Sequence, residues 1–483
     1  MSIHVLAPRQ DLSHDLGAPE QRWNEAHVKK IFADEIGGAV ADDLNNRATN
    51  QELQRVEGEI ENAAAPNYYE ESEAFYDASK ERTSNTQILS PEIVWLNING
   101  QGRKLTQQVT LDIDDHSCWD TKATEWQQET VYSAGQRVYP TGGSVGYLYK
   151  CTTPGTSSSL TPSWPTTPGD TYNDGSVVWT CELDTSFSTS RAGKDFYIFA
   201  CANAETPLVP DLIVSMNSTV PEGYTSANSR KIGGFHCLCA DVGTITDHPL
   251  SGYVAGDILP CSIWDLNHRP IGEPEGYAYD EGTDMWYSIY GLTWSGTWGS
   301  ATATQPGRAE DDTLALESKY GAEWADGTSS EKWHCWKIEQ ILARQKQRLP
   351  YQREFMSASL GSNQGTNIYG SADPVTTGGH KDTGNRRMIS NIGLEDMCGD
   401  HYQWGADVGQ ASTSGSYGNA YDGNDKYEAG QVYGTVSRPL LGLSWSYGAG
   451  CGSRGSDWSA GALVLSANCG ARGASEPLRK RAM

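Results

Sequence analysis

The pattern of apolar and polar positions predicts helices near the N-terminus. Residues 18–36 carry apolar side chains at helical spacing behind Pro19, a residue that suits the first turn of a helix. In a second stretch, four apolar residues follow the heptad spacing of a coiled coil over a short span. These are Leu53, Val56, Ile60 and Ala63. The stripe is as consistent with one amphipathic helix on a domain face as with a coiled coil, and self-association along it would make the protein an oligomer.

From residue 86 the pattern changes to the alternation of apolar and polar residues that is typical of strands. Residues 86–115 show it first, and it returns in residues 194–203, 211–219 and 229–239. Between these stretches, residues 124–182 are dense in turn residues and contain only short predicted strands. The sequence therefore predicts a β-rich domain into which a small β module is inserted.

The chain beyond residue 251 is rich in tryptophan and glycine. Two helices are expected in it, around residues 311–320 and 331–348. Short apolar runs then alternate with Gly and Ser in residues 386–409 and 437–473. This pattern predicts short strands joined by long loops, which is typical of a surface.

Composition narrows the class of partner. The chain of 483 residues is long enough for about three domains. Its 36 basic residues stand against 61 acidic ones, and the formal charge of −25 argues against DNA, RNA or an anionic membrane as a partner. With 16 Trp and 24 Tyr against 7 Phe, many aromatic side chains carry a polar group that suits interfaces. No apolar run approaches the roughly 20 residues of a membrane helix and no signal peptide is recognisable, so we expect synthesis in a cytoplasm without membrane insertion.

The cysteines predict free thiols. Eleven of them at irregular spacing do not form a disulfide framework. Cys237 and Cys239 have the spacing of a ligand pair, but strand alternation would place both on one buried face. Cys151 and Cys181 each end a predicted strand of the insert and could pair in an oxidising medium, although we favour the reduced pair.

Three motifs, in order along the chain, carry a family resemblance. They are ILARQKQRLPYQREFMSAS (residues 341–359), GLEDMCGDHYQW (residues 393–404), and RPLLGLSW (residues 438–445) with a closing CGARG (residues 469–473). Together they resemble the C-type-lectin-like fold that is shared by formylglycine-generating-type domains and by phage receptor-binding proteins of the major-tropism-determinant type. The resemblance covers about residues 330–473.

With this resemblance, the predicted fold class is α+β and multidomain. Residues 1–85 are expected to form a helical attachment and oligomerisation region, and residues 86–123 with 183–250 a β-rich shoulder. Residues 124–182 would be the inserted module, and residues 251–483 a C-type-lectin-like, receptor-binding domain.

The resemblance places the binding surface in the loops of the final segment. Between Trp445 and Trp458 the chain mixes Tyr, Ser, Gly and Trp, the composition of adaptable recognition loops. The expected receptor contacts are Tyr402, Trp404, Trp445, Tyr447, Ser453, Arg454, Asp457 and Trp458. Trp445 could instead pack in the core, which would leave Tyr447 and Trp458 as the exposed aromatic residues.

The insert is similar to carbohydrate-binding modules of the chitin-binding type. The matching positions are Trp126, Tyr132, Gly135, Val138, Tyr149, Lys150, Pro162, Trp164 and Trp179. The resemblance implies that sugar rings stack on exposed aromatic faces, with Tyr132, Trp164 and Trp179 as candidates. A domain of about 60 residues also needs aromatic side chains for its own core, and we favour that role for Tyr149 and Trp179. Related modules also serve as spacers in tail proteins.

The sequence favours neither a catalytic site nor a metal site. The oxidases of this fold need two closely spaced thiols to hold copper, whereas Cys451 and Cys469 lie eighteen positions apart. His380 and His401 do not form a ligand-spaced pair. Calcium is a separate case, because an acidic loop offers oxygen donors but lacks the frame of about twelve residues of a loop site. These donors are Asp422, Asn424, Asp425 and Glu428. A solvated acidic loop is favoured.

The predicted function is that of a viral tail fibre or tail-tip protein that binds a host cell surface receptor without catalysis, and the expected location is the virion tail. The receptor could be a glycan, a pilus or an outer-membrane protein. The N-terminal region would attach to other virion tail proteins, and the resemblance makes a homotrimer the first expectation. The alternatives are a structural tail or baseplate protein, and a formylglycine-generating-type enzyme, which copper or iron in the purified protein would favour.

Overall fold

The structure is a computed structural model, and it describes residues 74–92, 94–206, 208–295, 315–325, 333–374, 379–419 and 431–478. The predicted N-terminal helices, the heptad stripe and the calcium candidates lie outside these residues. All described residues belong to one unit, Asn67–Met483.

A four-stranded antiparallel sheet forms the centre of the shoulder. Its strands, in spatial order, are β13 (Asp211–Ser215), β12 (Asp195–Cys201), β14 (Ser229–His236) and β15 (Trp264–Asp265). The strands predicted in residues 194–203, 211–219 and 229–239 are therefore confirmed. β15 extends the sheet past residue 250, where the sequence places a domain boundary.

The strand β12 is buried on both of its faces, because successive side chains of a strand point in opposite directions. Phe196, Ile198 and Ala200 pack in one hydrophobic cluster, which we call the shoulder core. The alternate residues pack in a second cluster that also contains Tyr277 and Trp286. The shoulder sheet and the C-terminal part of the chain thus share a core.

Short elements from the start of the described chain close the shoulder core. They are α4 (Phe75–Ala78), η2 (Ser79–Glu81), β1 (Gln87–Leu89) paired with β4 (Thr110–Asp112), β2 (Val94–Ile98) paired with β3 (Gln101–Leu105), and η3 (His116–Cys118). Phe75, Ile88, Leu96 and Leu111 contribute apolar side chains to the cluster. The strands expected in residues 86–115 are confirmed.

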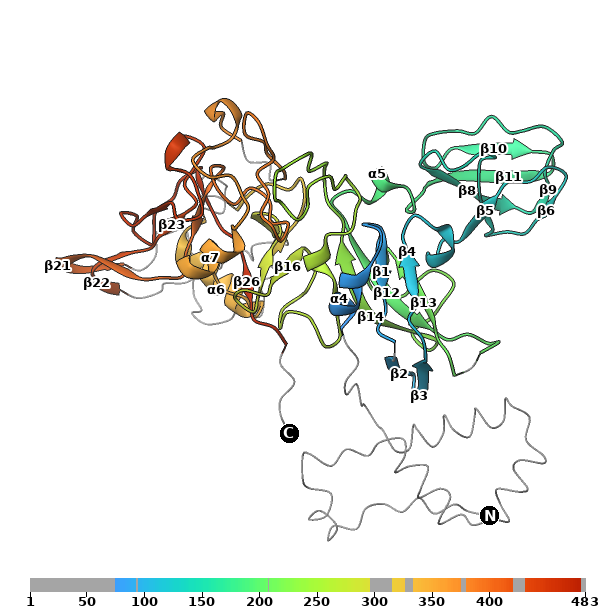
Figure 1. The fold of residues 1–483 in the computed structure, drawn as a ribbon, viewed down its shortest axis with the longest axis horizontal. Helices are drawn as coiled ribbons and strands as arrows, with labels where there is room; N and C mark the ends of the chain where they lie inside the picture. The colour runs from blue at the N-terminus through green and yellow to red at the C-terminus, as the bar shows by residue number, and fades with distance from the viewer. Residues whose placement is uncertain are drawn as a thin grey trace, which may run out of the picture. The chain divides into compact units, whose positions relative to one another are not determined.

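Residues 123–183 form a separate sheet, which we call the insert sheet (Figure 1). Its strands, in spatial order, are β10 (Thr171–Asp174), β11 (Val177–Leu183), β8 (Tyr147–Thr153), β7 (Arg137–Tyr139) and β5 (Ala123–Glu125), while β6 (Val131–Tyr132) pairs with β9 (Gly155–Thr156). Its aromatic and aliphatic side chains make a hydrophobic cluster of their own. The short helix α5 (Ser188–Arg191) follows it.

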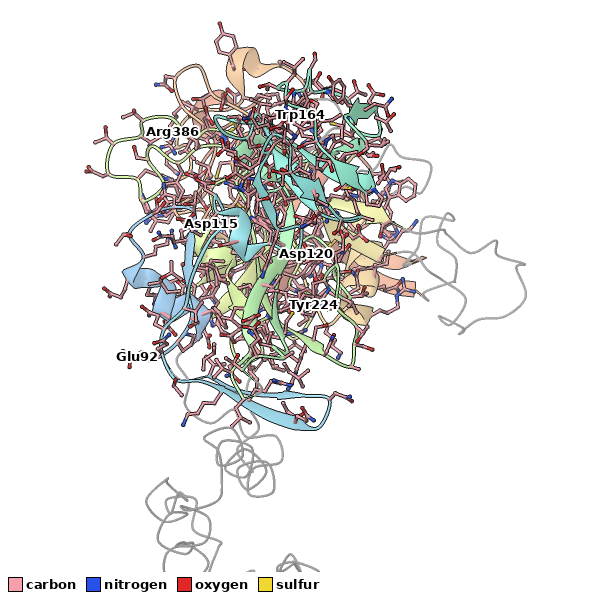
Figure 2. The ribbon with its side chains drawn as sticks, turned by 90° about the vertical axis from the view of Figure 1, so that its right-hand side faces the viewer. Glu92, Asp115, Asp120, Trp164, Tyr224 and Arg386 are labelled. Carbon is pink, nitrogen blue, oxygen red and sulfur yellow. The ribbon has the colours of Figure 1, made fainter. Side chains whose placement is uncertain are left out.

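Polar contacts join the insert sheet to the shoulder. Arg137 and Lys150 bind the two carboxylate oxygens of Glu222, at 2.8 and 3.0 Å. Within the shoulder, Asp120, labelled in Figure 2, fixes the segment that carries Glu222, because it accepts hydrogen bonds from the Ser215 hydroxyl at 2.6 Å and from the Glu222 backbone N–H at 2.8 Å. Charged side chains therefore hold the insert sheet against the shoulder, in addition to the two chain segments that connect them.

The described residues of the C-terminal part form short strands and two helices. Its strands are β16 (Tyr277–Asp280), β17 (Met285–Ser288) and β26 (Ala474–Ser475) in one sheet, β18 (Leu292–Ser295) paired with β19 (Ala315–Ser318), and β21 (Gly409–Asn419) paired with β22 (Gln431–Ser437). A further sheet joins β20 (Tyr402–Trp404), β23 (Leu440–Leu441), β24 (Ser456–Asp457) and β25 (Cys469–Gly470). The helices are α6 (Cys335–Arg344) and α7 (Gln352–Ala358), and the single turns are η4 (Pro260–Ser262), η6 (Tyr369–Ser371) and η7 (Gly448–Gly450).

One of the two helices predicted in this part is confirmed. The helix expected at residues 331–348 is present as α6, which buries Ile338, Ile341 and Leu342. The helix expected at residues 311–320 is wrong, because the described end of that range forms β19 and pairs with β18. A strand partner supplied by the fold outweighs a weak local preference for a helix.

Arg472 ties the end of the described chain to the interior. The side chain is fully buried, its Nε donates to Gln403 Oε1 at 3.0 Å, and Nη1 donates to the Ile289 carbonyl at 2.8 Å. Nη2 donates to the Glu395 carbonyl at 2.6 Å. The closing CGARG motif therefore has a structural role, and so does Glu395, whose carboxylate pairs with the buried Arg387.

All eleven cysteines are free thiols, and ten of them are buried. The prediction that Cys237 and Cys239 share one face is wrong: β14 ends at His236, and the two thiols enter different hydrophobic clusters. In the insert sheet, Cys151 lies opposite Trp179 and Cys181 lies opposite Tyr149, so these two thiols are diagonal neighbours. Among the described residues there is no helix with the length and apolar character of a membrane span.

Candidate functional site

The final loop of the C-terminal part is held on a small sheet. β23 is hydrogen-bonded on one side to β24 and on the other to β20, which also pairs in parallel with β25. We call residues 442–458, which run from the end of β23 past β24, the final loop. Gly442 begins it with a φ of +79°, and a Cβ there would lie 2.4 Å from the Met397 carbonyl oxygen. Only glycine fits this close approach.

Leu443 follows with a φ of +60°. A bulky residue in the left-handed region costs about 1–2 kcal/mol, so the surrounding contacts must hold it there. Its carbonyl accepts a hydrogen bond from the Gly399 backbone N–H at 3.0 Å. The loop is therefore fixed at its base.

The prediction that Trp404 and Tyr402 contact a receptor is wrong. Trp404 is fully buried, and Tyr402 is only 4 % exposed. The reason is their position on β20, an inner strand of the sheet, where both join a core cluster with α6. Burial is the first cause that raises the pKa of Tyr402 above its usual range, and the neighbouring Tyr447 hydroxyl is the next.

Trp445 is partly buried and anchors the loop. Its backbone N–H donates to the Asp400 carbonyl at 2.9 Å, and its ring meets the edge of His401 at 5.2 Å between centroids. His401 in turn stacks on the buried Trp324 at 4.5 Å. This stack favours the alternative in which Trp445 supports the loop.

Tyr447 and Trp458 are the two exposed aromatic tips of the loop, at 49 % and 39 % exposure. The Tyr447 ring packs edge-on against Tyr402, with centroids 5.5 Å apart. The Trp458 indole N–H donates to Ser456 Oγ at 3.3 Å. Each tip thus rests on a residue of the sheet while one side of its ring faces outward.

The three polar candidates differ in how much of their side chain is free. Ser453 donates through its backbone N–H and hydroxyl to Gln364 Oε1, at 3.0 and 3.2 Å. Asp457 accepts from the Ser459 backbone N–H at 2.8 Å, so part of its carboxylate is used to close a turn. Arg454 is exposed and has no hydrogen-bond or ion-pair partner among the described residues.

Beside the final loop lies a groove of about 740 Å³. Four segments line it, namely residues 245–248, residues 360–364 except Asn363, Arg386 with Asn391, and residues 450–455. Asp247 and Arg454 bring opposite charges to the lining. The groove brings Ser453 and Arg454, which are expected receptor contacts, together with three segments that contain no expected receptor contact.

Two groups brace the wall of the groove. His248 Nδ1 accepts from the Leu250 backbone N–H at 3.1 Å and its Nε2 lies 3.3 Å from the Ile389 carbonyl, while burial lowers the pKa of the ring. Arg386, labelled in Figure 2, donates to the carbonyl oxygens of Arg387 and Gly361, at 3.1 and 2.6 Å. Burial lowers the pKa of Arg386. The periodicity of apolar residues predicts helices and strands but not such contacts between loops. The polar composition of residues 244–248 is the one local sequence signal for them.

In the insert sheet, the prediction that aromatic residues stack on a sugar is wrong for two of the three candidates. Trp179 is fully buried and Tyr132 is 5 % exposed, because both belong to the cluster that forms the core of this small sheet. Trp164, labelled in Figure 2, is partly exposed but stacks on Tyr149 with centroids 4.1 Å apart. One face of the Trp164 ring is therefore already occupied.

Within the described part of the chain, no three His, Cys, Asp or Glu side chains group in a way that could hold a metal ion. Cys451 is buried, its Sγ lies 3.4 Å from the Ser444 carbonyl, and burial raises the pKa of its thiol to about 11. Cys469 is also buried, beside Asn468.

The comparisons with known proteins agree with the resemblance that the motifs carry. Residues 166–265 match the family described as the Mtd second domain. A tail fiber receptor-binding protein of Bordetella phage BPP-1 is 25 % identical over 308 residues, which cover 62 % of this chain and 76 % of the relative. The match to the second domain begins inside the insert sheet and continues through β15.

Two solved structures have a similar fold. The Major Tropism Determinant I1 Variant aligns with a TM-score of 0.53 at 21 % identity, over 82 % of each chain. The Major Tropism Determinant M1 Variant aligns with a TM-score of 0.52, also at 21 % identity and over 82 % of each chain. The predicted similarity to phage receptor-binding proteins of the major-tropism-determinant type is confirmed, and with it the expected C-type-lectin-like architecture of the C-terminal part.

Proposed function

We propose that this chain is a receptor-binding protein of a phage tail, and that its final loop binds the host cell surface without carrying out a reaction. The observation that supports this most directly is the exposure of Tyr447 and Trp458 at the tips of a loop whose other large apolar side chains, Leu443 and Trp445, are partly buried. The proposal also takes support from the relative in Bordetella phage BPP-1, which is described as a tail fiber receptor-binding protein.

The two tips have the physical properties of binding residues. Tyr and Trp offer a large contact area while losing little conformational freedom, because each has only two side-chain torsions. Tyr447 is held by the ring of Tyr402, and Trp458 by the hydroxyl of Ser456. The binding surface is therefore largely ordered before the partner arrives, which reduces the entropy that binding costs.

The test is a pair of variants of the full chain. Replacing Tyr447→Ala and Trp458→Ala together removes both tips, and we expect adsorption to cells of the phage host to fall by at least about thirtyfold, since a single central aromatic residue contributes about 2 kcal/mol or more. Adsorption is measured by flow cytometry with labelled protein. Trp294→Ala is the matched control, because Trp294 is 41 % exposed on β18 and lies outside the final loop.

Two results would contradict the proposal at different levels. If the double variant keeps its circular dichroism spectrum and adsorbs normally, the assignment of the tips is wrong. If the unmodified chain does not adsorb to host cells at all, the proposed function is wrong.

We further propose that the protein acts as a homotrimer held together by its N-terminal region. The heptad spacing of Leu53, Val56 and Ile60 suits a coiled coil, and the number of three chains rests on the resemblance to phage receptor-binding proteins of the major-tropism-determinant type. Light scattering of the full chain should give three times the mass of one chain, and replacing these three residues by serine should reduce it to one. A single-chain mass for the unmodified protein would contradict the trimer.

A further inference from the structure

The groove beside the final loop differs in chemistry from the aromatic tips. Its lining contains no Phe, Trp or Tyr, and it is formed mainly by glycine backbone and polar side chains. We propose that it binds one anionic saccharide unit of the host surface, a sugar ring that carries a carboxylate. This inference rests on the proposed function, and it names the chemical class of one part of the receptor.

Arg454 is the group that would bind the carboxylate. It lines the groove and has no ion-pair partner among the described residues, although several other arginines of this acidic chain do. Examples are Arg137, Arg348 and Arg438. The planar guanidinium donates two parallel hydrogen bonds to a carboxylate, which gives both affinity and orientation.

Other side chains of the groove suit the hydroxyl groups of a sugar. Asp247 lies in residues 245–248 of the lining, is exposed, and has no ion-pair or hydrogen-bond partner in the described part of the chain. Its φ of +57° places an aspartate in the left-handed region, in the turn that the His248 N–H closes on the Ile245 carbonyl at 3.3 Å. An ionised carboxylate accepts hydrogen bonds from sugar hydroxyls, and the Asn391 amide can both donate and accept.

The lining favours a sugar over the other ligands. A volume of about 740 Å³ lies within the roughly 300–1,000 Å³ of small-molecule sites, so the groove has room for a sugar ring. A protein anchor would also favour aromatic or aliphatic pockets, and only Ile245 and Leu360 are large apolar residues here. Without an aromatic face for stacking, a neutral sugar has less to bind than a charged one.

The experiment measures binding of small probes to the full chain by saturation-transfer NMR and titration. The acidic probes are D-glucuronic acid, D-galacturonic acid and N-acetylneuraminic acid, and D-glucose and D-galactose are the neutral probes. A triglutamate peptide tests the protein source of a carboxylate. We expect at least one acidic sugar to bind about tenfold or more tightly than the neutral sugars, because only its carboxylate makes charge-assisted hydrogen bonds to Arg454. It should also bind about tenfold more tightly than the peptide, which has carboxylates but no sugar hydroxyls for Asp247 and Asn391.

Variants then locate the binding. Arg454→Gln should weaken the acidic sugar at least about tenfold, and Asp247→Asn, which also tolerates the left-handed backbone, should weaken it by a smaller factor. Arg353→Gln is the matched control, because Arg353 is an exposed arginine on α7 that does not line the groove. It should leave the affinity unchanged.

Three results would overturn the inference. One is that no acidic sugar binds the unmodified chain while the same preparation adsorbs to host cells, in which case the proposed function still stands. The second is that the neutral sugars or the peptide bind as tightly as the acidic sugars. The third is that Arg454→Gln binds the acidic sugar as well as the unmodified chain does.

Discussion

The insert sheet and the final loop have similar composition but use their aromatic residues in opposite ways. In the insert sheet, the indole N–H groups of Trp126 and Trp179 both donate to Asp174, at 2.9 and 3.0 Å, and all three side chains are buried. In the final loop, Tyr447 and Trp458 remain exposed. Both regions are rich in Gly, Ser, Trp and Tyr, so composition alone does not decide which aromatic residues face the solvent.

For Trp179 and Trp458 the difference follows strand position. Trp179 lies on β11, which has neighbours on both sides in β10 and β8. Trp458 follows β24, which is the edge strand of its sheet. An inner strand places its side chains among those of two neighbours, whereas a loop after an edge strand can leave one side of a ring open. Trp126 also follows an edge strand, β5, but it is buried and its indole N–H donates to the buried Asp174. In the insert sheet the aromatic residues therefore stabilise the fold, whereas in the final loop they are exposed and available for binding.

The largest effect is expected at the centre of the insert sheet. Trp179→Ala should lower the free energy of unfolding by about 3–5 kcal/mol, because it removes a large buried side chain and leaves a cavity. Chemical denaturation followed by tryptophan fluorescence measures the loss. Val131→Ala is the control, since Val131 is 74 % exposed on β6 and should change stability little. A stable Trp179→Ala variant would remove the contrast between the two regions.

A smaller effect, with a dependence on pH, is expected from Asp174→Asn. Burial opposes the charge on Asp174, but hydrogen bonds from Ser158 and the two indole groups outweigh it, and the pKa is lowered. A carboxyl whose pKa is lower in the folded state stabilises the fold above its ordinary pKa of about 4, and this stabilisation is lost as the pH falls below it.

The variant should therefore be less stable at pH 7, by about 1–3 kcal/mol, and its stability should fall less than that of the unmodified chain between pH 5 and pH 2.5. Denaturation curves at several pH values test this. Parallel pH profiles for the two proteins would show that the charge on Asp174 does not stabilise the insert sheet.

The smallest effect on stability is expected at the tips of the final loop. Trp458→Ala should lower the free energy of unfolding by about 1 kcal/mol or less, because much of the ring already faces the solvent. The same denaturation assay measures it, alongside the adsorption assay of the double variant. A loss as large as that of Trp179→Ala would mean that Trp458 serves the fold and not the binding surface.

Much of the fold could be predicted from the sequence, because alternation along a strand is a local signal. The residues of β12, β13 and β14 show it directly, and the spacing of Ile338, Ile341 and Leu342 predicts α6. β19 could not be predicted, because what decides it is the pairing with β18. Such long-range contacts are not encoded in any single window of residues.

The candidate site was only partly predictable, for the same reason. The composition of the final loop indicates Tyr447, Arg454 and Trp458, which are exposed. The family resemblance also indicates Trp404, which is buried because β20 lies between β23 and β25. Asp247 and Asn391 join the groove only when the fold brings their loops together, and the polar composition of residues 244–248 is the one local signal for it.

The closure of the C-terminal part by its last segment bears on how the protein is made. β26 pairs with β17, and Arg472 donates to the Ile289 carbonyl 183 positions earlier in the chain, so it takes its place only near the end of synthesis. Contacts between residues so far apart in sequence form slowly, and β17, which pairs with β16 on one side, keeps an open edge on the other side until they form. We therefore expect this part to fold only after residue 475 has been synthesised. We also expect chains that end before Cys469 to aggregate, so that they are not assembled into the virion.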